Sequence, residues 1–250
     1  MSIQKAQAIV LKKFDFRDTS LIVTLFTRDF GKIKCVVKGV RKEASSDLVN
    51  FEVLSLIDII FYEKAKSELH LLSESSLADP MSSLRQNFRT MAYGWYLADL
   101  VDSFFELHEA SPRMFDLFAG TLKELRPSTL YSRVLRFELE VLKEAGMSPG
   151  LAACVRCRNG EGDEFFWSTR QGGLLCPVCG AGDRQAFRIS PEKLFFLRQM
   201  PVNEDHPFYE DVEGWIREFI RSRAESPMKS LVWLDSLDVF SRGAVSAPEP

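Results

Sequence analysis

The sequence predicts an α+β chain of more than one domain, in which an N-terminal β-barrel precedes an α-helical domain that carries a cysteine-rich insertion. Three observations support this prediction. Apolar residues alternate with a period of two before Pro80 and recur with a period of about 3.6 after it. Four of the five cysteines form two C-x-x-C pairs inside the helical part. We therefore expect a barrel domain at 1–79 and a helical domain at 80–250, with the insertion at about 150–186.

The barrel domain reads as a series of short strands rich in β-branched and apolar residues. The expected strands are 7–12, 21–27, 32–38, 51–62 and 67–75. Gly31 closes the turn after the second strand, where a hairpin favours a residue with positive φ. Cys35 stands alone on the third strand, and we expect it to be a small core residue. Five such strands in about 70 residues fit the OB-fold, a closed barrel that commonly binds nucleic acids.

Helical spacing begins after Pro80, where a first helix is expected to carry 84–98. Three Ser-Pro pairs look like helix starts, because serine caps the first turn and proline suits the first helical position. These pairs are Ser111-Pro112, Ser190-Pro191 and Ser226-Pro227. Further helices are expected at 129–145, ending before Gly146, and at 209–223. The cysteine-rich insertion therefore interrupts a helical domain.

The cysteine pairs are Cys154 with Cys157 and Cys176 with Cys179, separated by 18 residues. A C-x-x-C turn aims both sulfur atoms at one point, so two turns supply the four thiolates that one zinc ion binds tetrahedrally. The residues between the pairs read as a hairpin, and Gly180 follows the second pair where the chain must fold back beside the metal. Because four protein ligands leave no open position, we expect a structural zinc ribbon. Two disulfides or a redox-active pair are the alternatives.

A net charge of −3 hides a strong asymmetry along the chain. Residues 1–42 carry ten Lys or Arg against three Asp, which gives +7, so the remainder carries −10. A basic segment of this kind predicts a surface for a polyanion, although a solvated basic face without a partner would give the same pattern. The residues favoured for phosphate contacts, in order, are Lys38, Arg41 and Lys42, and then Lys32 and Lys34.

Aromatic and basic residues elsewhere could extend such a surface. Phe16 and Phe30 lie in expected turns amid basic residues, where they could stack on bases or pack against the end of the barrel. Four arginines of the ribbon could lengthen the basic track or remain solvated: Arg156, Arg158, Arg170 and Arg184.

Several classes of protein are not favoured by the sequence. The first ten residues contain Lys5 and lead into no long apolar run, so no signal peptide is expected. The most apolar stretch, 51–62, contains Glu52 and Asp58, which argues against a membrane span and favours a cytoplasmic protein. The chain has no G-x-x-x-x-G-K-[ST] or G-x-S-x-G motif, and its three histidines are scattered. We therefore expect a protein that is not an enzyme.

The order of parts and several segments resemble the RecO family of bacterial recombination mediators. The segments that carry the likeness are 19–27 with Gly31-Lys32, the Lys-Gly-Val-Arg-Lys run at 38–42, 137–149 leading into the first cysteine pair, and Gly-Gly-Leu-Leu-Cys at 172–176. The resemblance runs in the same order from residue 5 to about 240. Segment 43–47, Glu-Ala-Ser-Ser-Asp, departs from the family's serine- and proline-rich pattern, so the resemblance does not define how far the basic surface extends beyond Lys42.

The resemblance implies a DNA repair and recombination mediator that binds single- and double-stranded DNA and anneals complementary strands. Members of the family engage the acidic C-terminal tail of single-stranded DNA-binding protein, and with RecR they help to load RecA at the nucleoid. Arg85, Arg89, Arg133 and Arg136 are available to meet that tail. The alternatives are a zinc-ribbon protein that acts on RNA or in transcription, and a thiol oxidoreductase that uses Cys154 and Cys157.

Overall fold

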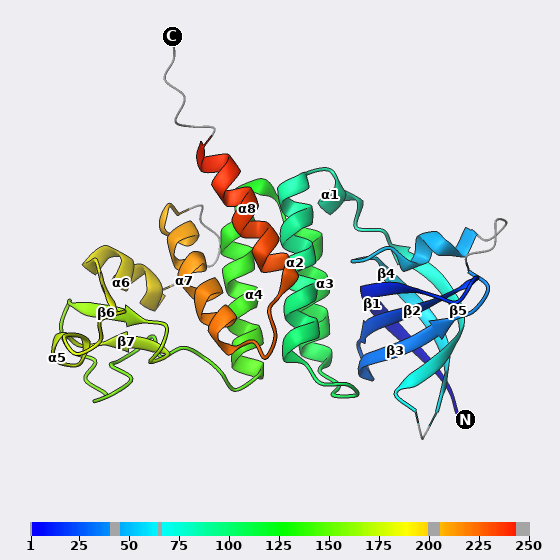
Figure 1. Cartoon of the computed structure of the whole chain (residues 1–250), viewed down its shortest axis with the longest axis horizontal. Helices are drawn as coiled ribbons and strands as arrows, with labels where there is room; N and C mark the ends of the chain where they lie inside the picture. The colour runs from blue at the N-terminus through cyan, green and yellow to red at the C-terminus, as the bar shows by residue number, and fades with distance from the viewer. Residues whose placement is uncertain (1, 41–45, 65–66, 200–205, 244–250) are drawn as a thin grey trace, which may run out of the picture. The chain divides into compact units, whose positions relative to one another are not determined.

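The computed structural model describes residues 2–40, 46–64, 67–199 and 206–243 (Figure 1). The chain divides into two compact units. The barrel unit comprises Met1–Pro127 and Met228–Pro250, and the ribbon unit comprises Ser128–Pro227. The predicted domain boundary at residue 79 stays a prediction.

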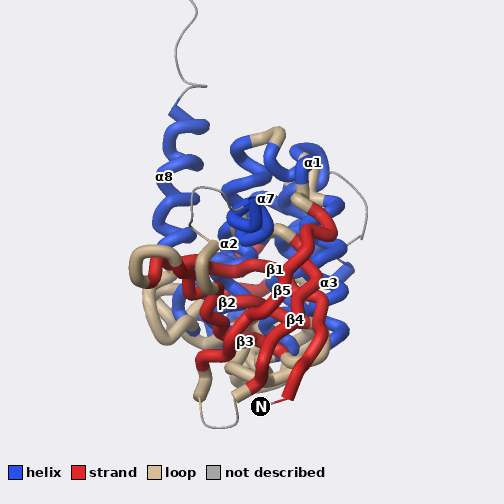
Figure 2. Tube along the Cα trace, turned by 90° about the vertical axis from the view of Figure 1, so that its right-hand side faces the viewer, coloured by secondary structure: helices blue, strands red, loops and turns tan. Residues whose placement is uncertain are grey.

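The barrel is built from five strands that close on themselves (Figure 2). They are β1 (Ser2–Phe16), β2 (Ser20–Thr27), β3 (Gly31–Val37), β4 (Leu56–Glu63) and β5 (Leu69–Asp79). The strand order is β1-β2-β3-β5-β4, with β4 paired to β1 and only β3 and β5 parallel within this barrel. The predicted OB-fold is therefore confirmed. Gly31 has a φ of +65°, as the predicted hairpin requires.

The fourth strand begins later than predicted. Residues 51–55 were expected to be extended, but a 3₁₀ helix occupies Ser46–Phe51 and β4 starts at Leu56. Phe51 and Leu54 are fully buried, and the N–H of Leu54 donates to the carbonyl of Val10 at 2.8 Å. These two apolar side chains therefore cover the barrel core from a loop. A run of apolar residues in the sequence does not distinguish such a loop from a paired strand.

The barrel unit also contains four α-helices in its described residues. They are α1 (Ser82–Arg85), α2 (Phe88–Phe104), α3 (Pro112–Glu124) and α8 (Lys229–Gly243). The single helix predicted across 84–98 is broken at Asn87, whose side-chain oxygen accepts hydrogen bonds from the N–H groups of Arg89 and Thr90 and so starts α2. Pro112 opens α3 as predicted, whereas α8 begins two residues after Pro227.

Helices α2 and α3 cover one end of the outer surface of the barrel. Phe26 of β2 points outward, and its ring centroid lies 5.4 Å from that of Phe105, just after α2. It also lies 6.1 Å and 6.5 Å from the rings of Phe115 and Phe118 on α3. This aromatic cluster fixes the helices on the barrel, while Phe14 near the other end of β1 stays 59% exposed.

The ribbon unit combines four helices with a small sheet in its described residues. The helices are α4 (Leu130–Glu144), α5 (Pro177–Gly180), α6 (Pro191–Gln199) and α7 (Phe208–Arg223), with a 3₁₀ turn at Pro127–Thr129 before α4. The strands are β6 (Phe165–Ser168), β7 (Gly173–Leu175) and β8 (Phe187–Ile189), in the order β7-β6-β8. The predicted hairpin is present, but its third strand, β8, was not predicted.

The predicted end of α4 is confirmed. Gly146 has a φ of +69°, and its N–H donates to the carbonyl of Lys143 at 3.1 Å. The N–H of Met147 donates to the carbonyl of Leu142 at 2.7 Å, which completes a Schellman motif. Among the helices that the structure describes, none is both long and apolar enough to cross a bilayer.

Candidate nucleic-acid interface and metal centre

The outward residues of β1, β2 and β3 form one face of the barrel, which we call the outer face. On β3, Ile33, Cys35 and Val37 point into the barrel core and are buried. Successive side chains of a strand point to opposite sides, so Lys32 and Lys34 point outward. Burial raises the pKa of the Cys35 thiol to about 12, which agrees with its predicted place as a small core residue.

Lys32 and Lys12 are held by carboxylates of α2. The ammonium of Lys32 lies 3.2 Å from Asp102 Oδ1 and donates to the Asp102 carbonyl at 2.5 Å, and its side chain is only 11% exposed. Lys12 on β1 lies 2.7 Å from Asp102 Oδ2 and 3.1 Å from Asp99. Burial would by itself raise the pKa of Asp102, but the two lysines lower it. The charge of Lys32 is therefore balanced within the fold.

Lys34 and Lys38 are placed differently from Lys32. Lys34 is half-buried on the outer face, and Lys38 is exposed just after β3. Within the described residues, neither lysine has an ion-pair partner. Arg41 and Lys42, also favoured for phosphate contacts, lie outside the described residues. Of the five favoured residues, the structure thus shows two, Lys34 and Lys38, as unpaired cations on the outer face and just after it.

The two phenylalanines considered for stacking are both partly packed. Phe30 packs on the barrel core, with its ring edge-to-face to that of Phe61 at 5.4 Å. Phe16 is half-buried, and the guanidinium of Arg17 lies 5.1 Å from its ring. Sequence reasoning missed Phe14, because the first strand was expected to end at residue 12. Simple alternation from the core residue Val10 would have placed Phe14 inside the barrel, but a β-bulge between Val10 and Lys12 reverses the two sides of β1.

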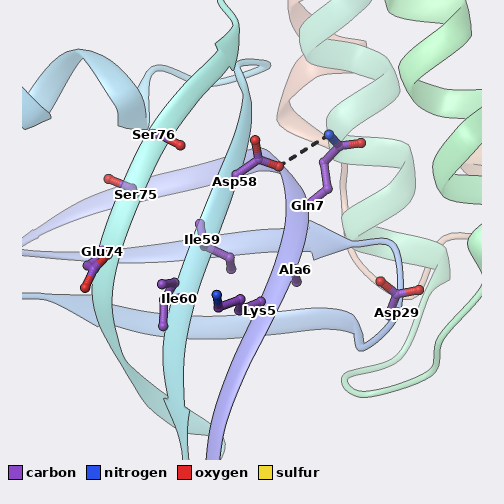
Figure 3. A pocket seen from close by; sticks show the side chains of 10 residues that line it. All are labelled: Lys5, Ala6, Gln7, Asp29, Asp58, Ile59, Ile60, Glu74, Ser75 and Ser76. Atoms are coloured by element: carbon purple, nitrogen blue, oxygen red, sulfur yellow. Dashed lines mark hydrogen bonds between the residues drawn. The ribbon is translucent and has the colours of Figure 1, made fainter.

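A second face of the barrel, on β1, β4 and β5, carries an open hollow of about 500 Å³ (Figure 3). It is lined by Lys5, Ala6, Gln7, Asp29, Asp58, Ile59, Ile60, Glu74, Ser75 and Ser76. The side-chain amide of Gln7 donates to Asp58 Oδ1 at 3.4 Å, which links β1 to β4. Three carboxylates outnumber the single ammonium here, so this face repels a polyanion. The hollow therefore does not extend the basic surface.

The four paired cysteines gather at one point of the ribbon unit. Their sulfur atoms all lie within 4.8 Å of one another, and the Sγ atoms of Cys157 and Cys176 are 3.6 Å apart. All of the chain's cysteines are free thiols, so the structure does not contain the alternative of two disulfides. The cluster could hold one metal ion.

The chain around the cluster favours the ligand form of Cys154. Burial would raise the pKa of this thiol, but backbone N–H groups of Cys157, Cys176 and Arg156 lower it to about 6. At Cys179, the neighbouring thiol of Cys176 raises the pKa to about 12, and burial adds to this effect. One thiolate thus forms readily, and a cation must displace the remaining protons, so metal binding at this site falls as the pH falls.

Close packing explains two glycines of the ribbon. A Cβ atom on Gly180 would lie 2.8 Å from a ring carbon of Phe166, which confirms that the chain folds back there with no room for a side chain. Gly173 has a φ of +153°, and a Cβ atom there would lie 2.4 Å from the carbonyl oxygen of Gly150. These contacts hold the second cysteine pair against the sheet.

The ribbon arginines differ in their partners. Arg170 lies 3.6 Å from the buried carboxylate of Asp183, which also accepts a hydrogen bond from Ser168 at 2.7 Å. Three others are exposed and have no ion-pair partner in the described part of the chain: Arg156, Arg158 and Arg184. These three are free to meet a polyanion, although solvation alone accounts for them equally well.

Two family models match nearly the whole chain. Residues 1–81 match Recombination protein O N terminal, and residues 85–231 match Recombination protein O C terminal. The chain is 32% identical over 233 residues to DNA repair protein RecO of Salinibacter ruber, and the matched region covers 88% of each chain. It is 31% identical over 193 residues to DNA repair protein RecO of Oceanobacillus iheyensis, and the matched region covers 77% of this chain and 73% of that relative.

Proposed function

The chain belongs to the RecO family of DNA repair proteins, and we propose that it binds single- and double-stranded DNA through the outer face of its barrel and anneals complementary strands. The observation that supports this assignment is the pair of unpaired cations, Lys34 and Lys38, on an OB-fold. Arg41 and Lys42 follow in sequence and would extend the surface. Lys32 should contribute least, because Asp102 already balances its charge.

Annealing follows physically from such a surface. Each lysine that contacts a phosphate releases counterions, which gives binding that is strong, insensitive to sequence and sensitive to salt. Two strands held on one basic surface repel each other less and meet at a higher effective concentration. Because base pairing is spontaneous, no bond need be broken and no nucleotide hydrolysed.

The partners proposed for this chain come from the family resemblance. They are RecR, the C-terminal tail of single-stranded DNA-binding protein, and through them RecA, acting at the nucleoid in the cytoplasm. A tail that carries acidic residues would meet cations more readily than the carboxylate-lined hollow of the second barrel face.

The cysteine cluster is proposed to bind one structural zinc ion. Tetrahedral zinc with bonds of about 2.3 Å to sulfur separates neighbouring sulfur atoms by about 3.8 Å. The Cys157–Cys176 distance of 3.6 Å is close to this value. Four protein ligands would leave zinc without an open position, so it would brace the ribbon and take no part in chemistry.

Annealing of complementary oligonucleotides coated with single-stranded DNA-binding protein tests the proposal. The protein should accelerate annealing without added nucleotide, and Lys34→Ala with Lys38→Ala should slow it. Loss of two phosphate contacts should make the slope of log affinity against log salt shallower by about 1.4 for single strands. Lys5→Ala is the matched control, because Lys5 is exposed on β1 but lines the hollow of the second face.

The proposal fails if the wild-type protein neither accelerates annealing nor binds single strands at low salt. Equal effects of the double variant and of Lys5→Ala would move the DNA site away from the outer face. A strict preference for structured RNA would instead favour the alternative of a zinc-ribbon protein that acts on RNA.

A further inference from the structure

We propose that Phe14, Ile22 and Val36 form a platform on which a base of single-stranded nucleic acid stacks, with Phe14 as the stacking ring. This apolar row lies on the outer face and gives the barrel a means of preferring unpaired strands over duplex. The inference rests on the proposed function, since it names a base contact within the surface that binds DNA.

Strand register brings these three side chains into one row. Phe14 of β1 is paired with Ile22 of β2, and Ile22 is paired with Val36 of β3. Their neighbours Leu21, Val23 and Cys35 belong to the barrel core, so the three point outward. Phe14 is 59% exposed, and the other two are half-buried. An aromatic side chain thus stands next to Ile22 on the neighbouring strand, and Val36 continues the row on the strand after that.

Helix α2 does not reach this row. The next outward row is formed by Lys12, Thr24 and Lys34, and Lys12 in it is paired with Asp99 and Asp102 of α2. Beyond that row, the exposure of Phe14 shows that the fold itself leaves the ring uncovered. A large aromatic side chain that a strand keeps in water is a candidate contact for a ligand.

The charges around the row identify the ligand. On β3, Val36 stands between Lys34 and Lys38, each two residues or about 7 Å away along the strand. Neither lysine has an ion-pair partner within the described residues, so the apolar row has a free cation on each side. A ligand that places negative groups on both cations and a flat apolar group between them is a single-stranded nucleic acid, whose phosphates alternate with bases.

Duplex DNA cannot make the same contact, because its bases are stacked on each other and only its phosphates are available to the lysines. The platform therefore adds affinity for single strands alone. A base stacked on an aromatic side chain contributes about tenfold or more in affinity, and the contribution depends little on the base.

Binding of Phe14→Ala to three probes tests the inference: oligo(dT), an abasic strand of the same length, and duplex DNA, all at one salt concentration. Oligo(dT) should bind about tenfold more weakly than to the wild type, while the abasic strand and the duplex bind as before. Phe14→Trp should restore binding of oligo(dT). Ile3→Ala is the matched control, because Ile3 is also on β1 and 61% exposed but pairs with β4.

Two results would overturn the inference. One is an unchanged affinity of Phe14→Ala for oligo(dT); the other is an equal loss for all three probes, which would show that the variant disturbs the lysines rather than a base contact. Equal melting temperatures of variant and wild type establish that folding is intact. Failure of the proposed function is distinct, because then the wild-type protein itself binds none of the probes.

Discussion

Asp102 balances two lysines of the barrel and ties three elements together. It lies on α2 and contacts Lys12 of β1 and Lys32 of β3. Asp99, one helical turn earlier, accepts a hydrogen bond from Ser230 of α8 at 2.8 Å. These carboxylates therefore hold the barrel, α2 and α8 in one arrangement, and they leave Lys34 on β3 and Lys38 just after it without an ion-pair partner in the described residues.

Asp102→Asn should lower the free energy of unfolding by about 2 kcal/mol, because Lys32 would be left largely buried beside a neutral amide. Urea unfolding at pH 7 measures the loss. Asp116→Asn is the control: its pair with Arg28 at 2.9 Å joins side chains that are about half exposed, so the loss should stay below about 1 kcal/mol. Equal losses for both variants would show that burial does not strengthen the Asp102 pairs.

The pH dependence of Asp102 follows from the same contacts. Its pKa is lowered from 3.8 in the folded protein, so its stabilising contribution is complete above that value and is lost as the pH falls through the folded pKa. Wild type should therefore lose more stability than Asp102→Asn in acid, below about pH 4. Parallel stability curves for the two proteins would contradict this assignment.

At the scale of elements, helix ends were more predictable than strand limits. The end of α4 depends on one glycine, and Gly146 stands where a left-handed residue is needed. The start of β4 was mistaken by five residues because Phe51 and Leu54 are apolar for a tertiary reason. Strand β8 was missed because only three residues form it, and two of them, Phe187 and Arg188, are exposed. A single residue therefore determines where α4 ends, whereas packing against distant parts of the chain determines where β4 begins.

Gly146→Ala should lower the melting temperature, because alanine at a φ of +69° costs about 1–2 kcal/mol although a Cβ atom would meet nothing within 4 Å. Gly120→Ala is the matched control. Gly120 lies inside α3 with equally open space, and alanine there should stabilise the helix by about 0.8–1 kcal/mol. Effects of the same sign at both glycines would contradict the conformational explanation. Thermal unfolding followed by circular dichroism separates these outcomes.

At the scale of the whole molecule, the order of barrel, helices and cysteine pairs was predictable, because each part has its own spacing in the sequence. The cysteine cluster was predictable for the same reason, since each pair lies within four residues. The ion pairing of Lys32 was not predictable, because its partner Asp102 is 70 residues away along the chain. Phe14 was missed because the predicted strand ended at residue 12 and because the bulge between Val10 and Lys12 reverses the sides of β1, which alternation alone does not reveal.

Cys176→Ser should abolish binding of zinc and destabilise the ribbon unit, because three remaining ligands no longer complete a tetrahedral site. Zinc content after gel filtration and thermal unfolding measure the two effects. Cys35→Ser is the control: it places a hydroxyl in the barrel core and should cost stability without loss of zinc. A Cys176→Ser protein that kept full stability without zinc would exclude a structural metal, and protection of the thiols from alkylation until chelation would exclude a redox-active pair.

The barrel unit is discontinuous in sequence, since the chain leaves it at Pro127 and returns at Met228. During synthesis, α2 therefore leaves the ribosome well before α8 exists. The 100 residues of Ser128–Pro227 take about 5–20 s to make at about 5–20 residues per second. For that time Trp95 on α2 lacks Trp233, whose ring later lies 5.5 Å away. This helix surface is thus open to aggregation during that time.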